Sequence, residues 1–191
     1  YYLIPNDILL LKSINSLGIR SIKKKNYHEI FGYGLTGFNY KKTIKINAGN
    51  SGTLARLILG LLINSNNKIR IVGDRSLSMR DFSRITEPLK EFGANFKSNN
   101  NKLPVEIFGS EYLRPINYLE KIGSAQCKSA VMLAALKTPG VTRIKAKKSR
   151  DHTELLLKSL NIPIKISKTS DYDLIEIKGQ NSYTGFNYHV P

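Results

Sequence analysis

The residues with the clearest chemical potential form the segment Asn47–Arg56, with the sequence Asn-Ala-Gly-Asn-Ser-Gly-Thr-Leu-Ala-Arg. It separates an alternating run, 43–46, from an apolar run, 57–63. This order predicts a strand, a tight turn and a helix, with Asn50 or Ser51 as the helix cap. The free N–H groups of such a first turn, together with the positive end of the helix dipole, attract anions. We therefore expect a site for phosphate or carboxylate groups here.

Two glycines and an arginine in this segment fit an anion site. Gly49 and Gly52 can take a positive φ and let the backbone approach a ligand closely. Arg56 follows one helical turn later, where its guanidinium can bind an anion or orient the turn. The segment has neither the Gly-Lys-Ser/Thr of a Walker loop nor a full Gly-x-Gly-x-x-Gly fingerprint. Taken alone, it is also compatible with an ordinary capped turn.

Composition indicates a globular protein with an anionic partner. The chain has 191 residues, of which 41% are hydrophobic, enough for one large domain or two small ones. Its net charge of +16 favours nucleic acid or small phosphorylated molecules, although most individual lysines are expected only to solvate the surface. The single cysteine, Cys127, excludes an internal disulfide, and we expect it to be a core residue of a buried helix.

The cellular compartment is predicted from the absence of membrane-spanning and targeting segments in the sequence. It contains no apolar run long enough to cross a bilayer and no signal peptide at its start. With the lone cysteine, this predicts a cytoplasmic protein without a membrane partner. The chain begins with Tyr1 instead of methionine, so we expect it to be a piece of a longer protein.

Hydrophobic periodicity divides the chain into helices and strands. A polar loop is expected at 73–80, and the helix starting at Thr86 should carry Pro88 in its first turn. The spacing of Asp151 and Glu154 predicts a capping box, with His152 and Thr153 as further helix-start residues. Helices are expected at 8–17, 51–63, 86–92, 124–136 and 149–160, and strands at 19–22, 43–46, 68–72, 94–97, 103–108, 142–146, 162–166 and 174–177, with a glycine-broken strand pair at 28–42.

The order of these elements repeats. Residues 43–109 and 110–180 each read strand, buried helix, strand, amphipathic helix, strand, strand. Residues 1–42 show only the last three of these elements, so we expect a truncated first repeat.

The helices starting at Ser51 and Ser124 are apolar nearly all round, which is typical of buried helices. The strands alternate apolar residues with lysines, as do strands with one wet face. The sequence thus predicts an α/β (α+β) fold in one domain, residues 1–191, with three βαβαββ-type repeats around buried helices and the sheets outside.

Three further stretches join the first in a recognisable set of motifs. They are Gly73–Arg80 (Gly-Asp-Arg-Ser-Leu-Ser-Met-Arg), Ser124–Ala130 (Ser-Ala-Gln-Cys-Lys-Ser-Ala) and Ser149–Glu154 (Ser-Arg-Asp-His-Thr-Glu), and Leu103-Pro104 also fits. In this order the motifs resemble the 3-phosphoshikimate 1-carboxyvinyltransferases (EPSP synthases) of the enolpyruvyl transferase family. The resemblance implies one of the two domains of an inside-out α/β barrel.

The resemblance also implies a reaction. It is the transfer of the enolpyruvyl group of phosphoenolpyruvate to the 5-hydroxyl of shikimate 3-phosphate, in the shikimate pathway of aromatic amino-acid biosynthesis. No cofactor, metal or nucleic acid is expected, and we expect a monomer. The implied phosphoenolpyruvate site is Asn50, Gly52, Arg80 and Gln126, and the implied shikimate 3-phosphate site is Ser124, Ala125, Gln126 and Arg150.

The resemblance places the acid/base carboxylates, and further phosphoenolpyruvate-binding cations, in a second domain that we expect this chain to lack. The chain would then hold half of each substrate site, contain no catalytic residue and be inactive alone. One departure is Asp81, where the family usually has proline, and we expect it to alter the loop or weaken its positive field.

Two alternative functions fit parts of the sequence. UDP-N-acetylglucosamine enolpyruvyl transferases share the implied fold but use a reactive loop cysteine, and Cys127 lies in a different context. A basic RNA-binding domain is suggested faintly by residues 31–35, Phe-Gly-Tyr-Gly-Leu, which lack the leading basic residue and the Phe-Val ending of the RNA-recognition signature.

Overall fold

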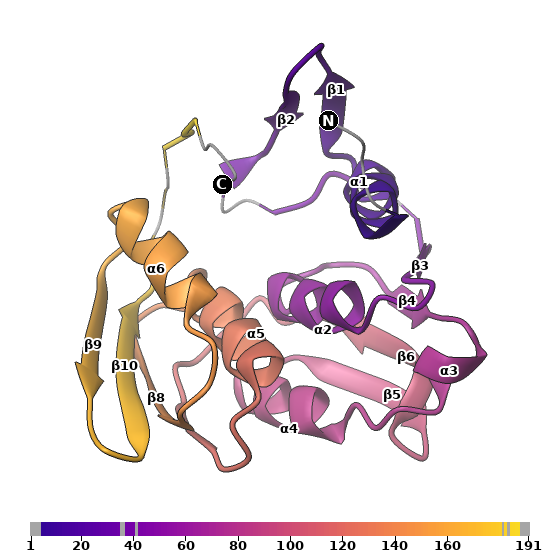
Figure 1. Cartoon of the computed structure of the whole chain (residues 1–191). Helices are drawn as coiled ribbons and strands as arrows, with labels where there is room; N and C mark the ends of the chain where they lie inside the picture. Colours follow the sequence, from indigo (N-terminus) through magenta and orange to yellow (C-terminus); the bar gives the residue numbers. More distant parts are fainter. Residues whose placement is uncertain (1–4, 35–36, 41, 181, 183, 188–191) are drawn as a thin grey trace.

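The structure, a computed structural model, describes residues 5–34, 37–40, 42–180, 182 and 184–187. Helices and strands are interspersed along the chain (Figure 1). The helices are α1 (Pro5–Ser16), α2 (Gly52–Leu61), α3 (Arg75–Ser78), α4 (Ser83–Glu91), α5 (Ala125–Ala135) and α6 (His152–Ser159). The strands are β1 (Arg20–Lys23), β2 (His28–Phe31), β3 (Ile44–Asn47), β4 (Ile69–Val72), β5 (Asn95–Asn99), β6 (Lys102–Phe108), β7 (Asn117–Glu120), β8 (Val141–Lys147), β9 (Ile164–Lys168) and β10 (Tyr172–Lys178). None of these helices is long and apolar enough to cross a membrane.

Two four-stranded sheets have the same topology. Their strand orders are β3-β4-β6-β5 and β7-β8-β10-β9. In each sheet the first two strands are parallel and all other neighbours are antiparallel. A parallel pair needs a crossover, which α2 supplies in one sheet and α5 in the other. Helix α1 is followed by the antiparallel pair β1-β2, which matches the last three elements of the larger units.

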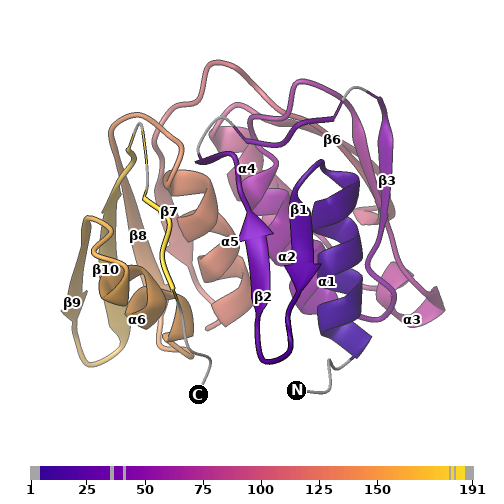
Figure 2. The same cartoon turned by 90° about the horizontal axis from the view of Figure 1, so that it is seen from above.

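The helices lie inside and the sheets outside. Helices α2 and α5 pack against each other in the middle of the molecule, with one four-stranded sheet on either side (Figures 1 and 2). The two helices approach closely at Gly60, where a Cβ atom would lie 2.2 Å from the carbonyl oxygen of Ala130. Only glycine allows this backbone contact.

Alternating burial along the strands explains why each sheet can face water on one side. In β8, Thr142, Ile144 and Ala146 are buried, whereas the alternate residues Arg143 and Lys145 are exposed. This alternation places one face of the sheet against the helices and leaves the other in solvent. The predicted fold class is confirmed, as is the burial of Cys127, which is 2% exposed.

Several predicted elements differ from the structure. Residues 75–78 form the short helix α3 in the expected polar loop, because the Asp74 carboxylate accepts a hydrogen bond from the backbone N–H of Leu77. Helix α4 begins at Ser83, where Asp81 Oδ1 accepts from the backbone N–H. Pro88 consequently lies inside this helix and not in its first turn, and it is buried there. Asp81 faces Ser83 and forms no ion pair with Arg80 in the described part of the chain.

The predicted strand pair at 28–42 is also wrong in its second half. Strand β2 ends at Phe31 and pairs with β1, and the described residues within 32–42 form no strand. Gly34 and Gly37 have φ values of 58° and 94°, which interrupt an extended strand. Residues 35, 36 and 41 of this prediction lie outside the described residues.

The predicted capping box at Asp151 and Glu154 does not form. Asp151 occupies the N-cap position of α6 but makes no capping hydrogen bond, because its carboxylate accepts from Lys168 Nζ at 3.1 Å. Glu154 points into the protein and pairs with Lys128. Long-range charges therefore replace the local caps.

Candidate anion-binding site

The turn before α2 leaves the start of this helix open. Ser51 is the cap, since its Oγ accepts a hydrogen bond from the backbone N–H of Leu54 at 3.2 Å. Asn47 Oδ1 accepts from the backbone N–H of Gly49, which has a φ of 54°. The first backbone N–H groups of a helix lack intrahelical partners, so this end of α2 can receive an anion.

Asn50 joins this turn to the loop that carries Arg80. Asn50 Nδ2 donates to Asp74 Oδ2 at 2.6 Å, and the backbone N–H of Asp74 donates to the carbonyl oxygen of Gly49 at 2.8 Å. Hydrogen bonds from Leu77 and Asn50 hold the pKa of the Asp74 carboxyl below its usual value, so it stays an acceptor. The loop and short helix α3 are thereby fixed, and Arg80 follows directly.

The guanidinium groups of Arg56 and Arg80 converge over Gly52. A Cβ atom at Gly52 would lie 2.9 Å from Nη1 of each arginine, so a side chain here would force both guanidinium groups to shift. Burial lowers the pKa of Arg56, and the positive charges of Arg80 and Arg84 lower it further. No carboxylate forms an ion pair with Arg56 or Arg80 within the described residues. Two adjacent cations without a carboxylate partner are a receptor for a ligand anion.

Gln126 connects the first turns of α2 and α5. Its Oε1 accepts from Arg56 Nη1 at 2.7 Å, and its Nε2 donates to Thr53 Oγ1 at 2.8 Å. The Arg56 guanidinium also lies over the ring of Phe82, 5.4 Å from its centroid. Arg56 thus holds the side chain of Gln126 in place and also contributes positive charge to the site. Two helix N-termini meet here, and their positive dipole ends act on the same space.

The turn that precedes α5 is organised by Glu120, whose side chain is 3% exposed. Its carboxylate accepts from the backbone N–H groups of Ile122 and Gly123, at 3.3 and 2.5 Å, and from Arg84 Nη2 at 3.1 Å. Ser124 follows as the cap of α5, because its Oγ accepts from the backbone N–H of Cys127. Arg84 is therefore a structural partner of this turn.

The loop containing Arg150 lies against the same turn. A Cβ atom at Gly123 would be 3.1 Å from the carbonyl oxygen of Lys148. Arg150 is exposed and makes no hydrogen bond or ion pair with the part of the chain that the structure describes. Its guanidinium is available to a ligand. Asn50, Gly52, Arg80 and Gln126 are brought together around α2, and the Arg150 loop is brought beside Ser124 and Ala125.

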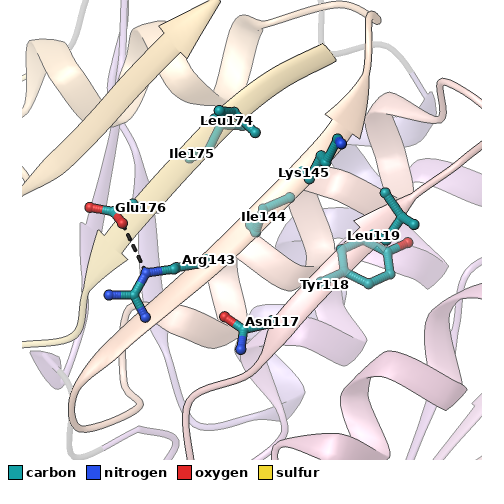
Figure 3. A pocket seen from close by; sticks show the side chains of 9 residues that line it. All are labelled: Asn117, Tyr118, Leu119, Arg143, Ile144, Lys145, Leu174, Ile175 and Glu176. Atoms are coloured by element: carbon teal, nitrogen blue, oxygen red, sulfur yellow. Dashed lines mark hydrogen bonds and ion pairs between the residues drawn. The ribbon is translucent and has the colours of Figure 1, made fainter.

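A separate depression of about 330 Å³ lies on the outer face of the second sheet (Figure 3). Exposed Leu119 and Leu174 line it, and Arg143 Nε on β8 donates to Glu176 Oε1 on the neighbouring strand β10 at 2.9 Å. None of the predicted site residues lines it. Of the two cations that line it, Arg143 is paired with this carboxylate, and Lys145 lies over the ring of Tyr172, 4.8 Å from its centroid. The depression therefore lacks the converging guanidinium groups found over Gly52.

The sequence did not reveal several residues that shape the site, namely Thr53, Arg84, Glu120 and Lys128. Lys128 could have been singled out from the sequence, because it is the one charged residue within the run 127–136 that was expected to be a buried helix. Among the described residues, no group of three or more His, Cys, Asp or Glu side chains could hold a metal ion.

Comparison with known proteins gives a consistent result. Residues 2–191 match the family model "EPSP synthase (3-phosphoshikimate 1-carboxyvinyltransferase)". A 3-phosphoshikimate 1-carboxyvinyltransferase of Vesicomyosocius okutanii is 37% identical over 192 residues, covering 100% of this chain and 43% of the relative. The enzyme of the same name from Clostridium tetani is 37% identical, covering 91% of this chain and 40% of the relative.

A solved structure shows the same fold. The EPSP synthase of Acinetobacter baumannii superposes with a TM-score of 0.84 at 30% sequence identity. The match covers 96% of this chain and 41% of the solved chain. The chain thus spans about two fifths of the length of the relatives that it matches.

Proposed function

This chain belongs to the EPSP synthase (3-phosphoshikimate 1-carboxyvinyltransferase) family, and we propose that the protein containing it transfers an enolpyruvyl group. The donor is phosphoenolpyruvate and the acceptor is the 5-hydroxyl of shikimate 3-phosphate, with phosphate as the second product. The protein acts in the cytoplasm, in the shikimate pathway, without a cofactor.

The observation that carries this proposal is the convergence of Arg56 and Arg80 over Gly52. Both substrates are polyanions, and paired guanidinium groups beside two helix N-termini suit phosphate and carboxylate groups. Phosphoenolpyruvate binds at Asn50, Gly52, Arg80 and Gln126. Shikimate 3-phosphate binds at Ser124, Ala125, Gln126 and Arg150. The burial of Cys127 argues against a reactive loop cysteine, and so against the UDP-N-acetylglucosamine enzyme.

The chain forms one domain, with repeats at 1–42, 43–109 and 110–180, and it works with a second domain of the same protein. Transfer of the enolpyruvyl group needs an acid/base carboxylate and further cations around phosphoenolpyruvate. The second domain supplies them, and closure of the two domains aligns the reacting atoms. The isolated chain is a monomer that binds substrate weakly and has no turnover.

Titration calorimetry of shikimate 3-phosphate into this chain tests the proposal. Arg150→Ala and Gln126→Ala should abolish the binding, because each removes a polar contact to the ligand. Arg143→Ala is the matched control, since Arg143 is an exposed arginine that pairs with Glu176 on the outer sheet face. Binding that survives both site substitutions would contradict the assignment. A folded chain with no binding at all would contradict a half-site on this domain.

A further inference from the structure

Lys128 and Glu154 form a fully buried ion pair between α5 and α6. Lys128 Nζ lies 2.5 Å from Glu154 Oε1, and the two side chains are 0% and 2% exposed. Apart from this ion pair, neither charged group has a hydrogen-bond partner among the described residues. The charges therefore depend on each other.

The position of Lys128 is electrostatically unfavourable without Glu154. A lysine near the start of a helix meets the positive end of the dipole, and its burial removes the ammonium from water. The equivalent position of α2, counted from its cap Ser51 as Lys128 is counted from Ser124, is Ala55, which is also fully buried. A small apolar residue thus suffices there. Buried ion pairs are often replaceable by apolar residues without loss of stability, so stability alone does not account for this one.

The ion pair links the two segments assigned to shikimate 3-phosphate. Lys128 follows the Ser124 turn on α5, and Glu154 lies in the first turn of α6, four residues after Arg150. A hydrogen bond of 2.7 Å between the hydroxyls of Ser129 and Thr153 runs alongside. In residues 148–151, which precede α6, the only described side-chain hydrogen bond or ion pair joins Asp151 to Lys168, and the exposed guanidinium of Arg150 has no described partner that would hold it in place.

We propose that Lys128 and Glu154 are positioning residues, which hold the Arg150 loop against the Ser124–Gln126 turn so that both contact one phosphorylated ligand. The role of the ligand rests on the proposed function. The pair acts through Arg150 and the Ser124 turn and does not touch substrate. The charge complementarity fixes one register of α6 on α5, which an apolar contact would leave less defined.

The test uses the full-length protein with the double variant Lys128→Met/Glu154→Leu. Removing both charges should leave the thermal unfolding midpoint near that of wild type, whereas Lys128→Met alone should lower it because Glu154 stays buried and unpaired. Amide hydrogen exchange of residues 149–155 should become at least tenfold faster in the double variant, while exchange of residues 129–135 stays slow. Unchanged exchange at 149–155 would overturn the proposal, whatever the ligand. If this double variant is less stable than wild type, Lys128→Met/Glu154→Gln, which also leaves no buried charge, is judged by the same criteria.

Binding and kinetics then test the ligand. The KM and the dissociation constant for shikimate 3-phosphate should rise about tenfold in the double variant, with kcat changed less than about twofold. Lys137→Met is the matched control, since Lys137 lies just beyond the other end of α5 and contacts Leu61 and Asn64. The dissociation constant of this variant for shikimate 3-phosphate should equal that of wild type. A stable double variant with wild-type affinity would overturn the positioning role. A wild-type protein that does not bind shikimate 3-phosphate would instead refute the proposed function, and the exchange rates would still decide whether the pair holds the loop.

Discussion

Arg56 Nη1 donates a 2.7 Å hydrogen bond to Gln126 Oε1, joining the N-terminal halves of two helices that lie in different repeat units. Each helix alone offers only an ordinary capped start. Joined in this way, α2 and α5 direct two helix dipoles and the guanidinium groups of Arg56 and Arg80 at one space. The repeat is thus what creates the site, because each unit contributes one helix N-terminus.

Gly52→Ala should weaken phosphoenolpyruvate binding. The added methyl group would meet Nη1 of both Arg56 and Arg80 at 2.9 Å and push the guanidinium groups apart. In the full-length enzyme we expect the KM for phosphoenolpyruvate to rise about tenfold, which corresponds to roughly 1.4 kcal/mol. Steady-state kinetics measures this change. Gly32→Ala is the control, since a Cβ there meets nothing within 4 Å; an unchanged KM in Gly52→Ala would refute the expected role of the small residue.

Gly60→Ala should destabilise the whole domain. Its Cβ would lie 2.2 Å from the backbone carbonyl of Ala130, so α2 and α5 would have to separate at the centre of the core. Overpacking of this kind costs about 1–3 kcal/mol. Urea denaturation measures the free energy of unfolding, again with Gly32→Ala as the control. Equal midpoints for wild type and Gly60→Ala would contradict the close backbone contact between the two helices.

Glu120→Gln should weaken both stability and binding of shikimate 3-phosphate. The substitution removes the ion pair with Arg84 and leaves fewer acceptors for the backbone N–H groups of Ile122 and Gly123, just before Ser124. Loss of a buried, charge-assisted network costs about 1–3 kcal/mol. Calorimetry and urea denaturation together measure the effect.

Glu176→Gln is the control for this substitution. Glu176 pairs with Arg143, but the two side chains are 42% and 62% exposed, so the change should cost less than about 0.5 kcal/mol. Equal effects of the two substitutions would mean that Glu120 does not organise the turn.

The stability of the domain should depend on Lys137 above pH 8. Burial lowers the pKa of Lys137 to about 8, from an ordinary value of 10.5. Between these two pH values the unfolded chain binds more protons than the folded one, so this group makes the free energy of unfolding rise with pH. Below pH 8 both states are protonated, and the cost of burying the charge is fully present.

Lys137→Met removes this titration. As the pH is raised from 8 to 10, the free energy of unfolding of wild type should increase relative to that of Lys137→Met, as measured by urea denaturation at each pH. A constant difference between the two proteins across this range would contradict the lowered pKa of Lys137.

The sequence by itself determined the fold class, the order of most elements and the starts of the two buried helices, near Ser51 and at Ser124. These features depend on hydrophobic period and on hydrogen bonds between residues close in the chain, which are legible without a structure. The four motifs also identified the family, because each keeps its residue types and spacing in chain order.

The tertiary structure decided which side chains meet. Glu154 has the spacing of a local cap, yet it pairs with Lys128, 26 residues earlier in the sequence. Asp74 caps the short helix α3 where a loop was expected, and Gln126 accepts a hydrogen bond from Arg56 of another repeat. Such pairings depend on how helices pack, since burial strengthens charge interactions and leaves each polar group in need of a partner. Local sequence specifies the helices, and only their packing specifies the site between them.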